Sequence, residues 1–179
     1  MREGRLGCRC LCSLHRQGTL RIFLRRKNAI FSRESMKIYP DANIYITYLL
    51  GQKGEQMSDR FFKQGIGCRF SIVASNTMFA EVAQRCKGSG IMLLQKNIDD
   101  FKRVGKIETH IVNQEETEEA VRMNSASGKI FGLNDMTHSL LAGKYADVFV
   151  TNDGDLVKFL KEEYGQNAVM LKEFVDSEP

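Results

Sequence analysis

The feature that most constrains this chain is a regular alternation of strand-like and helix-like segments between residues 37 and 171. The strand-like segments are rich in apolar, β-branched and aromatic residues, whereas the segments between them repeat apolar residues every three or four positions. Strands are expected at residues 37–41, 69–74, 107–112, 147–150 and 168–171. Parallel neighbours need crossover connections, which helices provide. We therefore expect an α/β fold, a three-layer α/β/α sandwich with a central, mostly parallel sheet of about five strands.

Four acidic residues lie where strands end or helices begin. Asp41 ends the first strand, and Asp153 follows the fourth strand just after Thr151. Glu81 lies in the second turn of the helix after the second strand, and Asp135 begins the helix before the fourth strand. Right-handed crossovers bring the carboxyl ends of parallel strands to one edge of the sheet, where ligands bind. All four carboxylates can therefore face the same edge.

Each acid also has a simpler interpretation. Asp41 stands directly before an apolar helix and would serve as its N-cap. Asp155 precedes Leu156 and could be a ligand or only the N-cap of the next helix, while Glu81 could be a solvated helix residue. Capping alone would not require several acids at one edge, so we interpret the group as a site.

Converging carboxylates favour a hard divalent cation, because such ions prefer oxygen ligands. Mg²⁺ or Mn²⁺ is the expected cofactor, and without it the four charges would repel one another. A bound ion can activate water and offset charge on a leaving oxygen, so phosphodiester hydrolysis is the reaction that fits. The chain has no P-loop sequence, and no serine or cysteine suits a triad with His110 or His138. We expect both histidines to be ordinary packing or surface residues.

Four short motifs follow one another along the chain. They are Asp41-Ala42-Asn43 after the first strand, Glu81 between an alanine and a valine, Asp135 in a helix that reaches Ala142, and the run from Thr151 to Leu156. In their order and spacing these motifs resemble the PIN domain family over about residues 37–171.

The resemblance implies a Mg²⁺- or Mn²⁺-dependent RNA endonuclease. It implies that the metal ligands, or the groups that orient the attacking water, are Asp41, Glu81, Asp135 and Asp153, with Asp155 as a further metal ligand. By the same resemblance Asn43 and Thr151 would hold the acids by hydrogen bonds. The compact form is also similar to VapC-type toxins of toxin–antitoxin pairs. That similarity implies an RNA substrate, an antitoxin partner and a homodimer.

Other functions stay open at the level of sequence. A PIN-fold nuclease could process RNA outside a toxin pair, or a non-catalytic member could bind RNA or protein as an interaction module. A phosphoacceptor domain also places an aspartate at the end of a strand, but it needs a lysine after the last strand, and Lys172 is only a loose candidate.

The N-terminal segment differs in composition from the rest of the chain. Residues 1–35 carry nine Lys/Arg and two Asp/Glu, a net charge of +7, whereas residues 36–179 have a net charge of −3. We expect 1–35 to be a basic leader, disordered or not translated in the native protein, because Met36 stands directly before the first strand. A transit peptide and a metal-binding tail with Cys8, Cys10 and Cys12 are the alternatives. Residues 36–179 would form the folded nuclease domain.

Cysteine usage and hydropathy suggest where the protein acts. Beyond the leader, Cys68 and Cys86 make no disulfide framework, which is typical of a reducing, cytoplasmic setting. No apolar run approaches the roughly 20 residues that span a bilayer, so no membrane partner is expected.

Overall fold

The computed structural model describes residues 35–67 and 69–177. The predictions for residues 1–34 of the leader and for Cys68 concern residues outside these ranges and remain predictions. The Pro40 ring removes a backbone donor, and this residue closes the first strand, where that donor is least needed. Membrane-spanning helices are absent from the described ranges, because none of the helices there is both long enough and apolar enough to span a bilayer.

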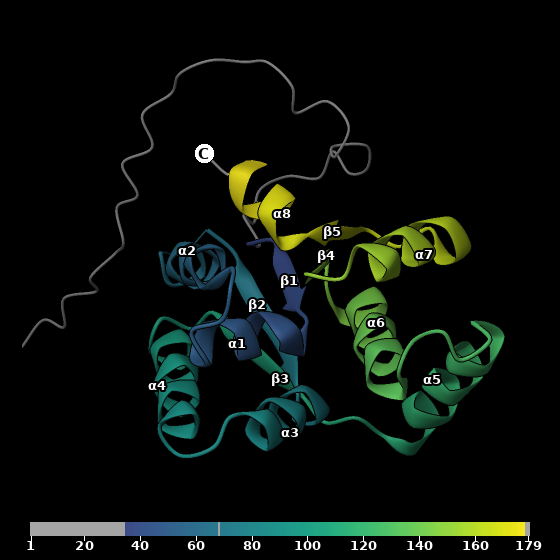
Figure 1. The fold of residues 1–179 in the computed structure, drawn as a ribbon, viewed down its shortest axis with the longest axis horizontal. Coiled ribbons are helices and arrows are strands. Elements are labelled where there is room, and N and C mark those ends of the chain that lie inside the picture. The colour runs from purple at the N-terminus through teal and green to yellow at the C-terminus, as the bar shows by residue number, and fades with distance from the viewer. Residues whose placement is uncertain (1–34, 68, 178–179) are drawn as a thin grey trace, which may run out of the picture. The chain divides into compact units, whose positions relative to one another are not determined.

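Five parallel strands form one sheet in the order β3-β2-β1-β4-β5 (Figure 1). The strands are β1 (Lys37–Pro40), β2 (Ser71–Ser75), β3 (Ile107–His110), β4 (Val148–Thr151) and β5 (Ala168–Met170). The order changes direction at β1, because the chain moves outward from β1 to β3 on one side and then crosses to β4 on the other. Ligands bind to open α/β sheets at this kind of switch point. The all-parallel sheet confirms the predicted fold class.

Side chains alternate between the two faces of the sheet, as expected for a period of two. Ile38, Ile72 and Val150 belong to one apolar cluster. Tyr39 and Phe149 belong to the other cluster, on the opposite face. Both faces of the sheet are therefore buried, which explains why the strand sequences are almost continuously apolar.

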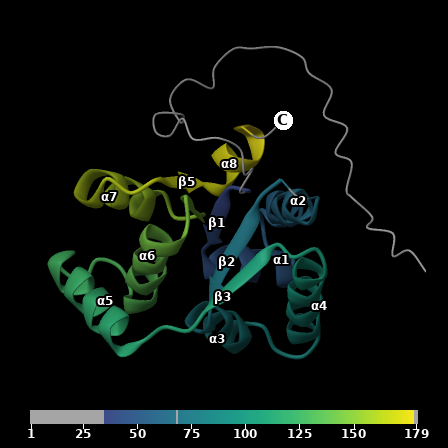
Figure 2. The same cartoon turned by 180° about the vertical axis from the view of Figure 1, so that it is seen from behind.

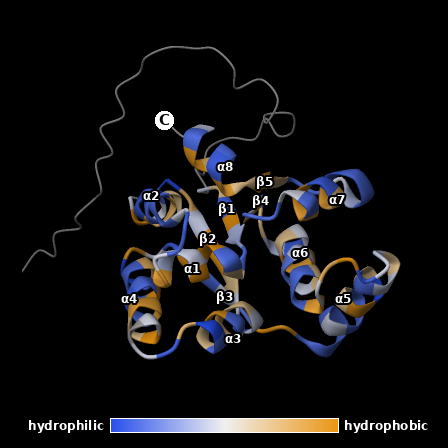
Figure 3. Ribbon diagram, viewed as in Figure 1, coloured by the Kyte–Doolittle hydropathy of each residue, from blue (hydrophilic) through white to orange (hydrophobic). Residues whose placement is uncertain are grey.

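Helices cover both faces and make the outer layers of the sandwich. Figures 1 and 2 show α1, α2 and α4 on one side of the sheet and α5, α6 and α7 on the other. Blue and orange segments alternate along helices such as α4, as expected for amphipathic helices (Figure 3). The helices are α1 (Ala42–Leu49), α2 (Glu55–Ile66), α3 (Asn76–Arg85), α4 (Ser89–Arg103), α5 (Gln114–Ala126), α6 (Leu133–Tyr145), α7 (Gly154–Tyr164) and α8 (Leu171–Ser177).

The C-terminal helix α8 was not anticipated from the sequence. Its Phe174 packs against Phe61 and Phe70, with ring centroids 5.7 and 5.5 Å apart. The same aromatic cluster closes over Gly65 of α2, where an added Cβ would lie 2.7 Å from the Phe101 ring. The last helix therefore completes the core on the α2 face.

Helix α5 carries a run of acidic residues, and one of them is buried. Glu116 is buried and accepts hydrogen bonds from Tyr145 Oη at 2.6 Å, His110 Nε2 at 2.9 Å and the Asn113 backbone N–H at 3.0 Å. Burial alone would raise the pKa of Glu116, but these hydrogen bonds outweigh it and lower the pKa to about 2. This carboxylate therefore links α5 to β3 and α6. His110 is part of that link, as a packing residue.

Candidate active site

Asp41 lies directly after β1, at the centre of the carboxyl edge. Its backbone N–H donates to Val150 O at 2.8 Å, and its side chain is buried. It occupies the N-cap position of α1, but its side chain makes no capping hydrogen bond. Instead Oδ2 accepts from Asn43 Nδ2 and from Thr151 Oγ1, both at 2.7 Å. The capping interpretation of this side chain is therefore wrong, because Asp41 faces β4.

Asn43 and Thr151 connect Asp41 to the loop after β4. Asn43 Nδ2 also donates to Thr151 Oγ1 at 3.0 Å, and Thr151 Oγ1 accepts from the Asp153 backbone N–H at 3.1 Å. The Asn152 backbone N–H lies 3.3 Å from Asn43 Oδ1. One network of short side chains thus fixes the Asp41 carboxylate relative to Asp153.

Glu81 reaches the same edge from the second turn of α3. Its Oε2 accepts from Asn134 Nδ2 at 2.9 Å and lies 3.2 Å from His138 Nε2. The hydrogen bond from His138 is the main cause that lowers the pKa of Glu81, and it outweighs the opposing effect of burial. Glu81 is thus held by α6 and is not a free solvated residue.

The position of His138 was missed by sequence reasoning, which treated it as an ordinary packing or surface residue. The ring is fully buried, with Nδ1 3.1 Å from Tyr39 Oη and Nε2 on Glu81. The signal was its spacing, because His138 follows Asp135 by three residues and so lies on the same face of α6.

Asp135 and Asp153 each combine a capping role with a place at the site. Asp135 Oδ2 accepts from the Gly132 backbone N–H at 2.8 Å, and Asp153 Oδ1 accepts from the Leu156 backbone N–H at 3.0 Å. Asp153 is therefore the N-cap of α7, and the alternative that Asp155 is that cap is wrong. Asp155 is exposed in the first turn of α7.

Electrostatic coupling shows that these acids form one group. Burial raises the pKa of Asp41, and the charges of Asp135 and Glu81 add to that effect, while His138 and Thr151 offset part of it. Burial also raises the pKa of Asp135, with further contributions from Glu81 and Asp153. The structure thus brings together the acids that the sequence placed at one edge.

The hydrogen bonds at these acids share a pattern. Across the described ranges, all hydrogen bonds to the carboxylates of Asp41, Glu81, Asp135 and Asp153 fall on one oxygen of each group. In the same ranges, the basic side chains within 4 Å of these carboxylates are limited to His138, whose Nε2 lies 3.2 Å from Glu81 Oε2. Four carboxylate oxygens therefore have no described protein partner.

A hard divalent cation fits this donor set, because each acid has an oxygen to offer and the group needs positive charge. Within the part of the chain that the structure describes, no three His, Cys, Asp or Glu side chains already stand at the spacing of a metal site. Asp41, Asp135 and Asp153 are the residues that could hold the ion.

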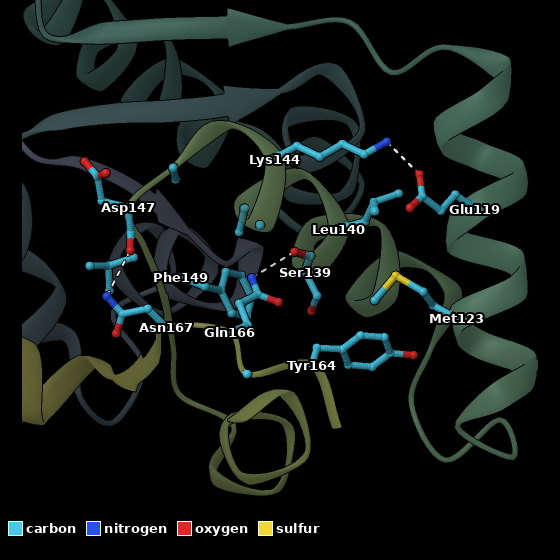
Figure 4. Close-up of a pocket in the computed structure, with 15 residues that line it drawn as sticks. Glu119, Met123, Ser139, Leu140, Lys144, Asp147, Phe149, Tyr164, Gln166 and Asn167 are labelled. Carbon is cyan, nitrogen blue, oxygen red and sulfur yellow. Dashed lines mark hydrogen bonds and ion pairs between the residues drawn. The ribbon is translucent and has the colours of Figure 1, made fainter. Parts of the chain in front are cut away.

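A cavity of about 490 Å³ lies apart from these acids, between α5, α6 and the start of β4 (Figure 4). Asp147 and Val148 contribute to its wall at the amino end of β4, whereas Asp153 follows the carboxyl end of that strand. The Lys144–Glu119 ion pair at 2.6 Å stands at its rim. This cavity belongs to the opposite edge of the sheet and does not include the acidic group.

Known proteins share the fold of this chain, although no family model and no curated protein sequence matches it. VapBC2 from Rickettsia felis, solved bound to a DNA fragment from its promoter, superimposes with a TM-score of 0.52 at 18% identity. The match covers 75% of this chain and 98% of the VapBC2 chain. PAE2754 from Pyrobaculum aerophilum matches with a TM-score of 0.48 at 13% identity, over 80% of this chain and 96% of that one.

The fold is therefore the PIN-like fold that the sequence motifs predicted. At this level of identity the comparison establishes the architecture, and the chemistry must be argued from the acidic group itself.

Proposed function

We propose that this protein is a Mg²⁺- or Mn²⁺-dependent endoribonuclease that hydrolyses RNA phosphodiester bonds at the carboxyl edge of its sheet. The observation that supports it is the shared pattern at Asp41, Glu81, Asp135 and Asp153. One oxygen of each is held by internal hydrogen bonds, and the other has no described partner. Such a group is unfavourable unless a cation neutralises it.

Each residue has a distinct role in the proposed reaction. Asp41, Asp135 and Asp153 hold the cation, with Asp155 as a further ligand candidate. When bound, the ion lowers the pKa of a water molecule and offsets charge on the scissile phosphate. Glu81 orients the attacking water by accepting a hydrogen bond from it, and its lowered pKa keeps the carboxylate charged for this role.

Asn43 and Thr151 keep the Asp41 carboxylate in place while the substrate binds, through their bonds to Oδ2.

RNA binding must depend on local positive charge, because residues 36–179 have a net charge of −3. Arg85 lies at the end of α3, and its charge contributes to the lowered pKa of Glu81. Arg85 follows Glu81 by one helical turn, so its guanidinium is placed to contact an RNA phosphate at this edge.

The fold shared with VapBC2 supports the proposal that this protein is the toxin of a type II toxin–antitoxin pair. We further propose that it acts in the cytoplasm as a homodimer. A run of exposed apolar side chains on α4, Ile91, Met92 and Leu93, offers a surface for a protein partner. A small gene for a DNA-binding protein directly upstream would support this role. A solitary gene would favour the alternative of an RNA-processing nuclease.

RNA cleavage with purified protein tests the proposal. With Mg²⁺ or Mn²⁺ the wild type cleaves labelled RNA and EDTA abolishes the activity, whereas Asp41→Asn and Asp153→Asn are inactive. In oxygen-18 water the product's new terminal phosphate carries the label, because water is the nucleophile. Equal activity in wild type and variants, or a cyclic phosphate product without label, would remove the proposal.

A further inference from the structure

A continuous chain of hydrogen bonds runs through the core and ends on Glu81. Thr77 Oγ1 lies 2.8 Å from Ser75 Oγ, and Ser75 Oγ lies 2.7 Å from Tyr39 Oη. Tyr39 Oη lies 3.1 Å from His138 Nδ1, and His138 Nε2 lies 3.2 Å from Glu81 Oε2. The chain passes from α3 through β2, β1 and α6 and returns to α3. Glu81 is thus fixed to the start of its own helix by groups from three other elements.

The chemistry of the two ends sets the direction of every donor. An ionised Glu81 only accepts, so His138 Nε2 carries a proton, and in the tautomer with its proton on Nε2 the Nδ1 atom accepts from Tyr39. At the other end Ser75 Oγ accepts from the Met78 backbone N–H at 3.1 Å, as the N-cap of α3. Ser75 can then accept from Thr77 and donate to Tyr39. Every hydrogen bond in this series is therefore donated in the direction of Glu81, and no pair of neighbouring polar atoms has two protons facing each other.

Packing of the core does not by itself require this series of hydrogen bonds. Tyr39, Ser75 and His138 are fully buried, and buried polar groups destabilise a core unless every one is paired. An apolar residue at each position would fill the same space without that requirement. The hydrogen-bonded polar residues add what apolar residues could not, a defined orientation of the Glu81 carboxylate. Its Oε2 is fixed by hydrogen bonds to His138 and Asn134.

We propose that His138 is a positioning residue for Glu81, which it holds through Nε2 in a tautomer fixed by Tyr39 and Ser75. The proposal deepens the proposed function and rests on it, because the positioned carboxylate is the one that orients the attacking water. His138 has no contact with the substrate in this role. It acts only through Glu81, which makes its effect separable from the effects of cation binding and RNA binding.

A matched pair of variants tests this role. In His138→Gln the amide nitrogen can approach the position of Nε2 and still donate to Glu81, whereas in His138→Asn the shorter side chain cannot reach it. We expect kcat to fall by about 10- to 100-fold in His138→Asn and to recover most of that loss in His138→Gln. The KM for RNA and the Kd for Mn²⁺, measured by calorimetry without RNA, stay within about twofold of wild type. Equal losses in the two variants, or a loss carried by KM, would overturn the proposal.

A double-mutant cycle with Glu81→Gln separates positioning from a general structural defect. If His138 acts through Glu81, adding His138→Asn to Glu81→Gln lowers kcat no further. Multiplicative losses overturn the proposal. Asn134→Ala, at the exposed second donor to the same Oε2, gives a smaller loss of kcat in a protein whose core is unchanged. Wild-type activity in that variant would also count against the proposal.

A spectroscopic measurement on the metal-free protein is independent of activity. The ¹⁵N chemical shifts of the His138 ring report which nitrogen carries the proton, and the proposal requires Nε2. A proton on Nδ1 alone overturns it even if the protein cleaves RNA. If the wild type neither binds Mn²⁺ nor cleaves RNA, the proposed function fails together with this inference. If it does both and the cycle is multiplicative, only this inference fails.

Discussion

Replacing Asp41 with asparagine should stabilise the metal-free protein, although this residue lies at the centre of the proposed site. The carboxylate is buried, and burial together with Asp135 and Glu81 raises its pKa. Its charge therefore opposes folding. Asparagine removes that charge and keeps an oxygen that can accept from Asn43 and Thr151.

The magnitude follows from two opposing contributions. Two hydrogen bonds at 2.7 Å become bonds to a neutral acceptor, and each loses about 1 kcal/mol. Among the described residues Asp41 has no ion pair, and removing a buried carboxylate of this kind recovers several kcal/mol, roughly 3–4 here. The net expectation is that the free energy of unfolding of Asp41→Asn rises by about 1–2 kcal/mol in EDTA. For a domain of this size the midpoint of thermal unfolding would rise by about 3–8 °C.

The gain should depend on pH and on metal. A carboxyl whose pKa is higher in the folded than in the unfolded state destabilises the fold above that folded pKa, and the penalty disappears as the pH falls through it. The advantage of Asp41→Asn should therefore be largest near pH 8 and shrink toward acid pH. Mg²⁺ at 100 times its Kd stabilises the wild type by about 2.7 kcal/mol, so saturating metal should reverse the order of stability.

The assay is urea and thermal unfolding, followed by circular dichroism, at several pH values in EDTA and in Mg²⁺. Asp99→Asn is the matched control, because Asp99 is exposed on α4 and, among the described residues, accepts a hydrogen bond only from Gln95. It should change stability by less than about 0.5 kcal/mol with no response to metal. A loss of 1 kcal/mol or more in metal-free Asp41→Asn, or no effect of Mg²⁺ on the wild type, would refute the reasoning.

Three further outcomes follow from particular contacts. Asp135→Asn should lower kcat for RNA cleavage at least about 100-fold. Asp155→Asn should lower it less, because Asp155 is exposed and has no described contact to the acids. Equal losses in the cleavage assay would contradict this ranking. Glu116→Gln should lower the free energy of unfolding by about 2 kcal/mol above pH 5. In urea titrations that difference should vanish as the pH falls from 4.5 to 2, because the ionised Glu116 stabilises the folded state and this stabilisation is lost when the carboxylate is protonated. Gly65→Ala should cost about 1–3 kcal/mol in the same titrations, since its Cβ would lie 2.7 Å from Phe101, while kcat stays unchanged; a fall in kcat at full folding would contradict it.

The sheet and most helices were predictable because their signals are local. Apolar strands such as residues 147–150 and the helical repeat around Met78 and Val82 depend on patterns that any few residues reveal. Bounds shifted by one or two residues, as in β2, which begins at Ser71 and ends at the N-cap Ser75. Helix α8 was missed because its support comes from Phe61 and other residues that are distant in sequence.

The candidate site was predictable in its acids and not in the groups that hold them. Topology alone places Asp41 and Asp153 at one edge, so their proximity followed from the alternation of strands and helices. The role of His138 depends on Tyr39 and Glu81, which are 99 and 57 residues away from it in the chain. No local pattern reports such contacts. For the same reason the burial of Glu116 inside an acidic helix was not visible in its charge run.

The most direct test of the central claim is calorimetric titration of Mn²⁺ into the wild type, Asp41→Asn, Asp153→Asn and the double variant. If the acids form one cation site, the wild type binds Mn²⁺ and each single change weakens the affinity by about 10- to 100-fold. The second change then adds less than the first, because the shared site is already impaired. Wild-type affinity in both single variants, or no binding to the wild type, would contradict the claim.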